Sequence, residues 1–546
     1  MAHILKPPCD EGVIQSAPEL DAQQLKRATQ SLPNAPSSIN GGWVLVATIL
    51  GSSMAFIDGT VVNVALPVLQ TDLNATVADV QWVVEAYSLF LAALILVGGS
   101  LGDHFGRRRI FAIGITLFTV ASVFCGLAPN VTVLIYARAI QGIGGALLVP
   151  GSLAIISASF DSKQRGRAIG TWSGFTAITS AIGPVLGGWL VEYASWRWVF
   201  FINVPMAVIV LLVLFWRVPE SRGEEGEGRR KLDWWGALLA TLGLGGIVYA
   251  LIESNDLGLS NPLVLITMGG GVVALILFVL VEARSQSPMM PLNLFRSRNF
   301  SGANLLTLLL YAALGASLFF VPFNLIRVQG YSPTAAGAAN LPLILIMFLL
   351  SRWSGGLVFR YGAKLPLVIG PMIAAAGFAL FALPGIGGSY WTTFFPAAVV
   401  LGIGMAVSVA PLTTTVMSAV DTQHAGIASG INNAVSRTAG LIAIAVMGIV
   451  VLAVFSSVLV SHLAVLHIPA GAQNIIVAQL NKLVGIEIPA GLNESTHAVV
   501  QRAISESFVT SFRVVMLTAS ALALGSALSA LLLIEGKKPQ IETKAS

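Results

Sequence analysis

Charged residues are scarce in this chain. They make up 10% of its 546 residues, against about a quarter in an ordinary soluble domain. Hydrophobic residues make up 55%, and the mean hydropathy is +0.83. One water-facing core cannot bury so much apolar surface, so most of the chain must have lipid as its solvent. This excludes a soluble globular enzyme.

Cysteine and histidine are also rare, with two and six residues respectively. Cys9 lies in a polar tail and Cys125 in an apolar run, so they indicate neither a disulfide framework nor a metal site. The nucleotide-binding pattern Gly-x4-Gly-Lys-Ser/Thr is absent, which argues against ATP hydrolysis. We therefore expect no metal, no cofactor and an ion gradient as the energy source. The first 40 residues hold no apolar segment, so we expect no cleavable signal peptide.

The apolar residues are grouped into 14 runs bounded by charge, Pro or Gly. Continuous runs of about 20 residues demand helices, because strands of a membrane β-barrel would alternate over about ten residues. The fold class is thus predicted to be an all-α polytopic membrane protein. The runs fall near residues 43–67, 80–101, 110–128, 132–156, 167–190, 198–216, 235–252, 262–282, 300–322, 337–358, 365–383, 392–418, 426–455 and 508–534.

The 30 Lys and Arg residues are unevenly distributed over the connecting loops. If the chain starts in the cytoplasm, most of them fall on the cytoplasmic side, as membrane proteins generally require. Both termini are then cytoplasmic, and the protein is a multi-pass protein of the plasma (inner) membrane. The net charge of +5 is explained in the same way, so no nucleic-acid partner is expected. The opposite side holds only Arg197, Arg327, Lys482 and Arg502.

Matches between two parts of the chain indicate a duplication. The segment that starts at Gly99 aligns without gaps on the one that starts at Gly355, and glycine patterns at Gly142 and Gly166 recur at Gly402 and Gly426. Each half then has six helices, and the pair at 235–282 is an insertion that we expect to lie outside the pore. Duplicated bundles are typical of transporters, with the substrate path between the halves.

The predicted organisation has five segments. Amphipathic residues at 472–483 predict a short surface helix or hairpin inside a covering loop. The segments are a disordered cytoplasmic tail (1–42), a first six-helix bundle (43–216), a cytoplasmic linker with two extra transmembrane helices (217–284), a second six-helix bundle with an extracytoplasmic loop at 456–506 (285–535), and a cytoplasmic tail (536–546).

Three ionisable residues lie inside the apolar runs of the first half: Asp58, Glu85 and Arg138. A charge in hydrocarbon is costly and normally faces a cavity or a partner, so it indicates function. All three lie at a similar depth, where neighbouring helices could bring them together. Burial raises the pKa of a carboxyl group and a nearby guanidinium lowers it, so such a site can load and release a proton. We assign proton coupling to these residues; the alternative is a fixed charge pair that only holds helices together.

Seven motifs stand out along the chain: Phe56–Pro67, Gly99–Arg109, Leu134–Gly142, Gly174–Gly188, Ser195–Pro205, Leu232–Gly236 and Pro291–Phe300. They resemble the motifs of the major facilitator superfamily, and more narrowly those of its 14-helix drug:proton antiporters, which are multidrug exporters. The resemblance runs from about residue 43 to 535 and implies a major facilitator fold with two six-helix halves and two extra central helices. Arg138 resembles the family's membrane-embedded coupling arginine and Asp58 its first-helix aspartate; Glu85 has no required counterpart.

The loop near residue 103 resembles the family's cytoplasmic latch between the halves. Its glycines permit a tight turn and close helix approach, while Asp103 and Arg107 can pair across it. His104 replaces the usual arginine, and Phe359 stands in the second copy where Asp103 stands in the first. The latch is therefore expected in the first half only. Its residues are Gly99, Asp103, Gly106, Arg107 and Arg108.

The fifth apolar run resembles a motif that the family associates with exporters. Its glycines give a thin helix face, and its proline removes a backbone donor and allows a bend. We expect an outer gate here; packing of small residues alone is the alternative. The gate residues are Gly174, Gly183, Pro184, Gly187 and Gly188.

These observations predict a proton-coupled exporter of amphipathic or cationic small molecules that works by alternating access, as a monomer in the lipid bilayer. An uptake symporter of the same fold is one alternative, disfavoured by the glycine-proline motif. Another is a membrane-embedded lipid-modifying enzyme, for which the sequence offers no nucleophile or metal cluster. A sensor is a third, and it would tolerate neutralisation of Asp58.

Overall fold

The computed structural model describes residues 41–160, 162–222, 233–285, 288–420, 425–466 and 468–536. Over these ranges the chain is helical without strands, and 14 helices are long and apolar enough to cross a membrane. The predicted fold class is confirmed. Most of the tail at 1–42, residues 223–232 of the linker and the tail beyond 536 lie outside the described residues.

The first half has six membrane spans. Their starts are fixed by local hydrogen bonds: Thr76 and Asp79 form a reciprocal capping box at the second helix, and Asn130 caps α5 through the Val133 amide. The helices are α2 (Gly41–Asp72), α3 (Val77–Phe105), α4 (Arg107–Leu127), α5 (Val131–Ser159), α6 (Ser162–Tyr193), and the pair α7 (Trp198–Phe201) and α8 (Asn203–Arg217) that forms the sixth span.

The second half repeats this plan with more interruptions. A π-helical turn, η2 (Asn324–Val328), ends its first span, and its second span is divided into short pieces. The helices are α11 (Arg298–Phe323), α12 (Pro333–Ala338), α13 (Leu341–Gly355), α14 (Leu357–Tyr361), α15 (Lys364–Phe381), α16 (Phe394–Ser418), α17 (Ala425–Val465) and α19 (Glu494–Leu533).

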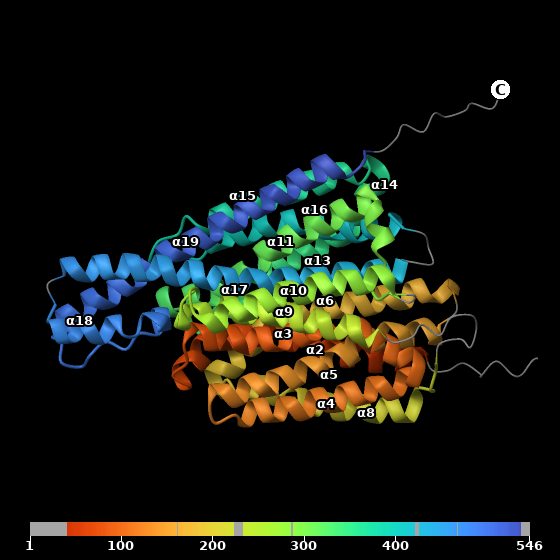
Figure 1. The fold of residues 1–546 in the computed structure, drawn as a ribbon, viewed down its shortest axis with the longest axis horizontal. Helices are drawn as coiled ribbons and strands as arrows, with labels where there is room; N and C mark the ends of the chain where they lie inside the picture. The colour runs from red at the N-terminus through yellow and green to blue at the C-terminus, as the bar shows by residue number, and fades with distance from the viewer. Residues whose placement is uncertain are drawn as a thin grey trace, which may run out of the picture.

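The two extra helices, α9 (Trp234–Leu257) and α10 (Pro262–Arg284), lie between the halves in Figure 1. Helix α9 packs against α3 of the first half and α17 of the second, and α10 packs against α9. The indole of Trp82 on α3 donates a hydrogen bond of 2.8 Å to Glu253 on α9. Most of α10 is exposed, as expected for a helix surrounded by lipid. This placement supports the expectation that the pair lies outside the pore.

The bundle has two distinct ends. We call the end where residues 41 and 536 lie the tail end, and the opposite end, which carries α18 (Ala470–Val477), the loop end (Figure 1). Helices α17 and α19 have 41 and 40 residues, so each is about 60 Å long and exceeds the hydrocarbon thickness of about 30 Å. They continue through much of the loop expected at 456–506. The amphipathic piece at 472–483 is divided between α18 and the 3-10 helix η4 (Leu480–Gly485).

Candidate functional site

A charged network lies buried in the core of the first half. Arg138 on α5 forms an ion pair of 2.5 Å with Asp58 on α2, and their side chains are 1% and 0% exposed. Gln141, one turn further along α5, donates to the second Asp58 oxygen and accepts from Arg138, both at 2.8 Å. Asp58 is therefore held at both oxygens by two side chains of one helix, and its charge is matched by a single guanidinium.

Two neighbouring helices complete the surroundings of Arg138. Its Nε donates to the Val83 carbonyl of α3 at 2.9 Å, and its guanidinium lies 4.3 Å from the ring centroid of Tyr87. A side chain at position 142 would collide with the Tyr87 carbonyl, so Gly142 is what lets α5 approach α3 closely enough for these contacts. The Tyr87 hydroxyl is buried and has no hydrogen-bond partner within the described ranges.

Uncharged polar groups extend the network towards α4 and α8. Gln141 also contacts the Ser122 hydroxyl at 3.4 Å, and Ser122 accepts from Asn203 at 2.9 Å and donates to the Phe200 carbonyl at 2.8 Å. Sequence reasoning missed Gln141, Ser122 and Asn203, because an uncharged polar residue in a membrane helix is not exceptional. Gln141 and Asn203 lay within motifs, and Ser122 did not.

Glu85 stands apart from this network. It is completely buried, and neither carboxylate oxygen has a hydrogen-bond partner among the residues described. Gln81, four residues earlier on α3, donates to the Ile444 carbonyl of α17 at 2.7 Å. Residues four apart share a helix face, so Glu85 lies one turn further along the face of α3 on which Gln81 meets α17. Of the three predicted coupling residues, the structure joins Asp58 to Arg138 and leaves Glu85 separate.

A further intramembrane charge, Arg437 on α17, was not singled out from the sequence. It interacts electrostatically with Tyr87 and pairs with no carboxylate in the described part of the chain. It lies 12 residues after Ala425, about 18 Å along the helix. The rule that found Asp58 would have found Arg437 if it had been applied to the apolar run at 426–455. An arginine of the second half thus interacts electrostatically with the tyrosine whose ring lies against Arg138.

Within the described ranges, the predicted latch residues make their hydrogen bonds and ion pairs with the first half and with residues 218–221, which directly follow α8. Arg107 pairs with Asp103 at 2.8 Å and reaches the Ala154 carbonyl of α5 at 3.4 Å. The Arg108 amide donates to Glu220 at 2.9 Å. In this conformation the latch therefore does not join the halves.

One structural expectation about the latch glycines is wrong. Gly106 has a φ of +108°, a backbone conformation that favours glycine, and it makes the turn between α3 and α4. At Gly99, however, an added Cβ would lie at an ordinary 3.5 Å from Pro150. The close approach of α3 to α5 occurs at Gly98, where a Cβ would collide with the Ala146 carbonyl. Two adjacent glycines cannot be told apart by spacing alone when the helix partner is unknown.

The glycines of the predicted gate have three different environments. Gly183 and Gly187 pack on Thr60 and Val61 of α2, and a Cβ at either position would clash. Gly188 packs on the Pro333 carbonyl of α12 in the second half. Around Gly174, nothing lies within 4 Å of an added Cβ. The packing reason for glycine therefore holds at the loop end of α6 and not at its middle.

The contact between α6 and α12 is reciprocal. Gly337 of α12 packs on the Pro184 carbonyl just as Gly188 packs on the Pro333 carbonyl. The Thr334 amide of α12 also donates to Glu192 of α6 at 3.1 Å. The two halves thus touch through backbone at the loop end, beside the proline that the sequence assigned to a gate.

A family model described as Major Facilitator Superfamily matches residues 48–445. The chain belongs to the Major Facilitator Superfamily. It is 37% identical over 426 residues to the multidrug resistance protein Stp of Mycobacterium tuberculosis, and the aligned region covers 77% of each chain. It is 32% identical over 490 residues to the tetracenomycin C resistance and export protein of Streptomyces glaucescens. This alignment covers 89% of this chain and 90% of that one.

Solved structures of superfamily transporters share the fold. A bacterial homologue of the human lysosomal transporter Spinster aligns with a TM-score of 0.62 at 17% identity, over 92% of this chain and 100% of that one. The xylose transporter XylE from E. coli aligns with a TM-score of 0.54 at 15% identity, over 91% and 97%. Membership of this superfamily makes the chain a transporter rather than an enzyme.

Proposed function

We propose that this transporter exports amphipathic small molecules, including antibiotics, in exchange for protons. The relatives named for multidrug resistance and for tetracenomycin C export support the substrate class and the direction. The observation that carries the proton exchange is the buried pair of Asp58 and Arg138. A carboxylate in a membrane core can bind and release a proton, and each such event changes the charge of the site.

The proposed orientation places the tail end in the cytoplasm and the loop end outside, with both termini inside and the chain acting as a monomer. Basic residues such as Arg107, Arg108 and Arg109 cluster at the tail end, which is the cytoplasmic side of most membrane proteins. With this orientation, the contacts between α6 and α12 close the protein to the outside. The conformation described here would then receive substrate from the cytoplasm.

The proposed coupling rests on mutually exclusive occupancy. When Asp58 is ionised, Arg138 and Gln141 hold it; when it is protonated, the attraction between α2 and α5 falls, which favours a different arrangement of the helices. If bound substrate and the proton exclude each other, proton entry must drive substrate exit. Each proton that moves inward supplies ~2.3 kcal/mol per 100 mV of membrane potential.

The test is Asp58→Asn in reconstituted vesicles with an imposed pH gradient. We expect gradient-driven export to be lost while substrate binding stays measurable, because the neutral amide resembles the protonated acid. Asp72→Asn is the matched control, since Asp72 ends the same helix and bonds Trp196 at the rim, and it should transport normally. Gradient-driven export at the wild-type rate by Asp58→Asn would contradict the proposal.

Two further measurements decide between the alternatives. Glu85→Gln, tested in the same vesicles, should keep proton-driven export at least in part if Asp58 carries the proton. If only Glu85→Gln stops export, the coupling role belongs to Glu85. The direction of substrate movement in inverted vesicles separates an exporter from an uptake symporter.

A further inference from the structure

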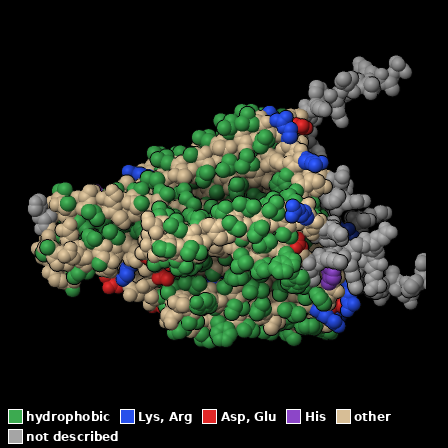
Figure 2. Space-filling model, viewed as in Figure 1, with side chains coloured by type: hydrophobic (Ala, Val, Ile, Leu, Met, Phe, Trp, Pro, Cys, Tyr) green, Lys and Arg blue, Asp and Glu red, His purple; other side chains and the backbone are tan. Residues whose placement is uncertain are grey.

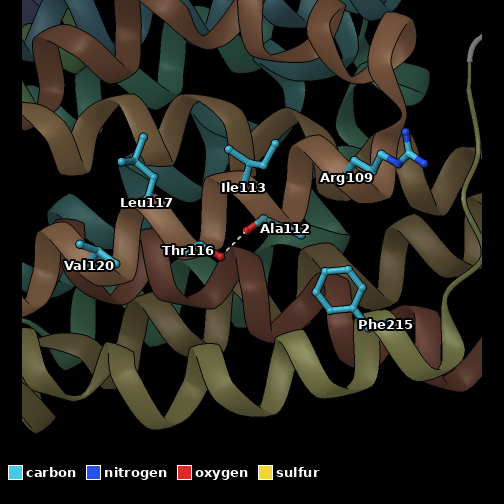
Figure 3. Close-up of a pocket in the computed structure, with 7 residues that line it drawn as sticks. All are labelled: Arg109, Ala112, Ile113, Thr116, Leu117, Val120 and Phe215. Carbon is cyan, nitrogen blue, oxygen red and sulfur yellow. Dashed lines mark hydrogen bonds between the residues drawn. The ribbon is translucent and has the colours of Figure 1, made fainter.

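A groove on the outer surface of the first half lies between α4 and α8, close to the tail end. It has a volume of about 570 Å3. Figure 3 shows its side chains along α4, with Phe215 contributed by α8. None of these residues takes part in the network around Asp58. The lining includes Arg109, Ala112, Ile113, Thr116, Val120 and Phe215.

The groove is apolar along its length and charged only at one end. Arg109 is the one charged residue in its lining, and the Thr116 hydroxyl donates to the Ala112 carbonyl of its own helix at 2.9 Å (Figure 3). From Ala112 to Val120 the lining side chains therefore offer a ligand no free hydrogen-bond donor. From Arg109 to Val120 the helix rises about 16 Å, close to half of a hydrocarbon core of about 30 Å. The groove thus has the polarity and length of one lipid leaflet.

The mouth of the groove carries more positive than negative charge. Arg109 has a side-chain exposure of 64%, and its ion pair with Glu220 is a loose one of 3.6 Å. Glu220 is shared, because it also accepts from the Arg108 amide at 2.9 Å and lies 3.9 Å from the Arg108 side chain. Figure 2 shows basic side chains gathered at the tail end, next to the hydrophobic face. An anion at the mouth would find a guanidinium that is only partly neutralised.

The position of the groove identifies the kind of ligand. Ile113, Val120 and Phe215 are 53%, 48% and 60% exposed, and all belong to helices that are apolar enough to span a membrane. Such side chains face lipid rather than water, so a soluble phosphate or nucleotide would leave the apolar walls uncovered. An anionic surface attracts basic residues that border it. The two requirements, an acyl chain and a negative head group, meet in one molecule.

We propose that this groove binds an anionic phospholipid, with the phosphate on Arg109 and one acyl chain along α4 between Ala112 and Val120. The inference does not depend on the transport activity proposed above. A phosphate on Arg109 competes with Glu220 for the same guanidinium. Removal of that carboxylate should therefore strengthen lipid binding, whereas removal of Arg109 should weaken it.

The test is native mass spectrometry of the detergent-purified full chain, titrated with phosphatidylglycerol. For Arg109→Gln we expect the tightest site to weaken about fivefold, the factor expected for one basic residue at an anionic surface. Thr116→Trp fills the groove without a change of charge and should remove that site, while Glu220→Gln should tighten it. Arg284→Gln is the matched control, because Arg284 is an exposed basic residue at the tail end of α10 and lies outside the groove.

Two results would contradict the proposed lipid site. Affinity of Arg109→Gln no lower than that of Arg284→Gln would overturn the proposal. Unchanged affinity of Thr116→Trp would also overturn it, because the attraction would then need no groove. Phosphatidylcholine, titrated as a zwitterionic probe, should show no difference between Arg109→Gln and the wild type. Each variant must elute from a size-exclusion column as a single species, which shows that it is folded. If Thr116→Trp does not, Val120→Trp, at an exposed position of the groove, replaces it.

Discussion

The loop end and the tail end of this bundle are joined in different ways. Among the described residues, five hydrogen bonds connect the halves, and all lie towards the loop end; they run between Gln70 and Lys482, Asn74 and Lys482, Gln81 and Ile444, Pro67 and Arg327, and Glu192 and Thr334. At the tail end, the latch residues bond to the first half and to Glu220 just after α8. The loop end is thus held by backbone contacts and neutral or singly charged hydrogen bonds, whereas the latch residues make no hydrogen bond or ion pair between the halves in the described ranges.

The 3-10 helix η4, in the loop between α17 and α19 of the second half, also connects the two halves at the loop end. Helix η4 contacts α2 and α3 of the first half as well as α17 and α19 of the second. Lys482 donates to Asn74 at 2.6 Å, its carbonyl accepts from Gln70 at 3.1 Å, and Asn481 donates to Asp256 at the end of α9 at 3.2 Å. A segment that bonds both halves must release one of them before the loop end can open.

Among tests of this difference between the loop end and the tail end, Gly188→Leu should have the largest effect. The added side chain would collide with the Pro333 carbonyl, and overpacking of this kind costs about 1–3 kcal/mol. The loop end should then stay open, and transport should fall at least about fivefold. Accessibility of a single cysteine at position 60 to a reagent added at the loop end should rise.

The control for this change is Gly174→Ala on the same helix, where nothing lies within 4 Å of an added Cβ. It should transport like the wild type. Equal losses in the two variants would show that α6 needs glycine for a reason other than contact with α12.

A second test addresses the tail end through Asp103→Asn. In the conformation seen here, the pair with Arg107 is partly exposed and contributes about 0.3–0.5 kcal/mol, so thermal stability should hardly change. We expect the latch to join the halves when the loop end is open, so turnover should fall several-fold with little change in substrate affinity. Weakened binding at normal turnover would assign Asp103 another role.

The smallest expected effect is that of Lys482→Ala. It removes one hydrogen bond to Asn74, worth about 1 kcal/mol, while the backbone bond to Gln70 can persist. The loop end should open about fivefold more often, measured with the same cysteine reagent. Asn474→Ala, at an exposed position of α18, is the control. No difference between the two variants would show that η4 does not hold the loop end closed.

The distribution of hydrophobicity was enough to place the membrane spans. All 14 apolar runs correspond to helices long enough to cross a membrane, because a backbone in lipid must satisfy its own hydrogen bonds and can do so only as a helix. Asp58 and Arg138 could be singled out for a similar reason, since any charge in hydrocarbon requires a partner. These conclusions depend on local chemistry and on the solvent.

Partnership between helices was decided by the tertiary structure. Asp58, Glu85 and Arg138 looked equivalent in depth, yet Arg138 bonds Asp58 and the Val83 carbonyl of α3, whereas Gln81, one turn before Glu85, bonds α17. Likewise, Gly98 rather than Gly99 meets α5. A step of one residue along a helix turns the side chain by about 100°. Which residue of a membrane helix meets which neighbour therefore depends on packing between helices. An apolar run does not reveal this packing, because its residues are hydrophobic on every side of the helix.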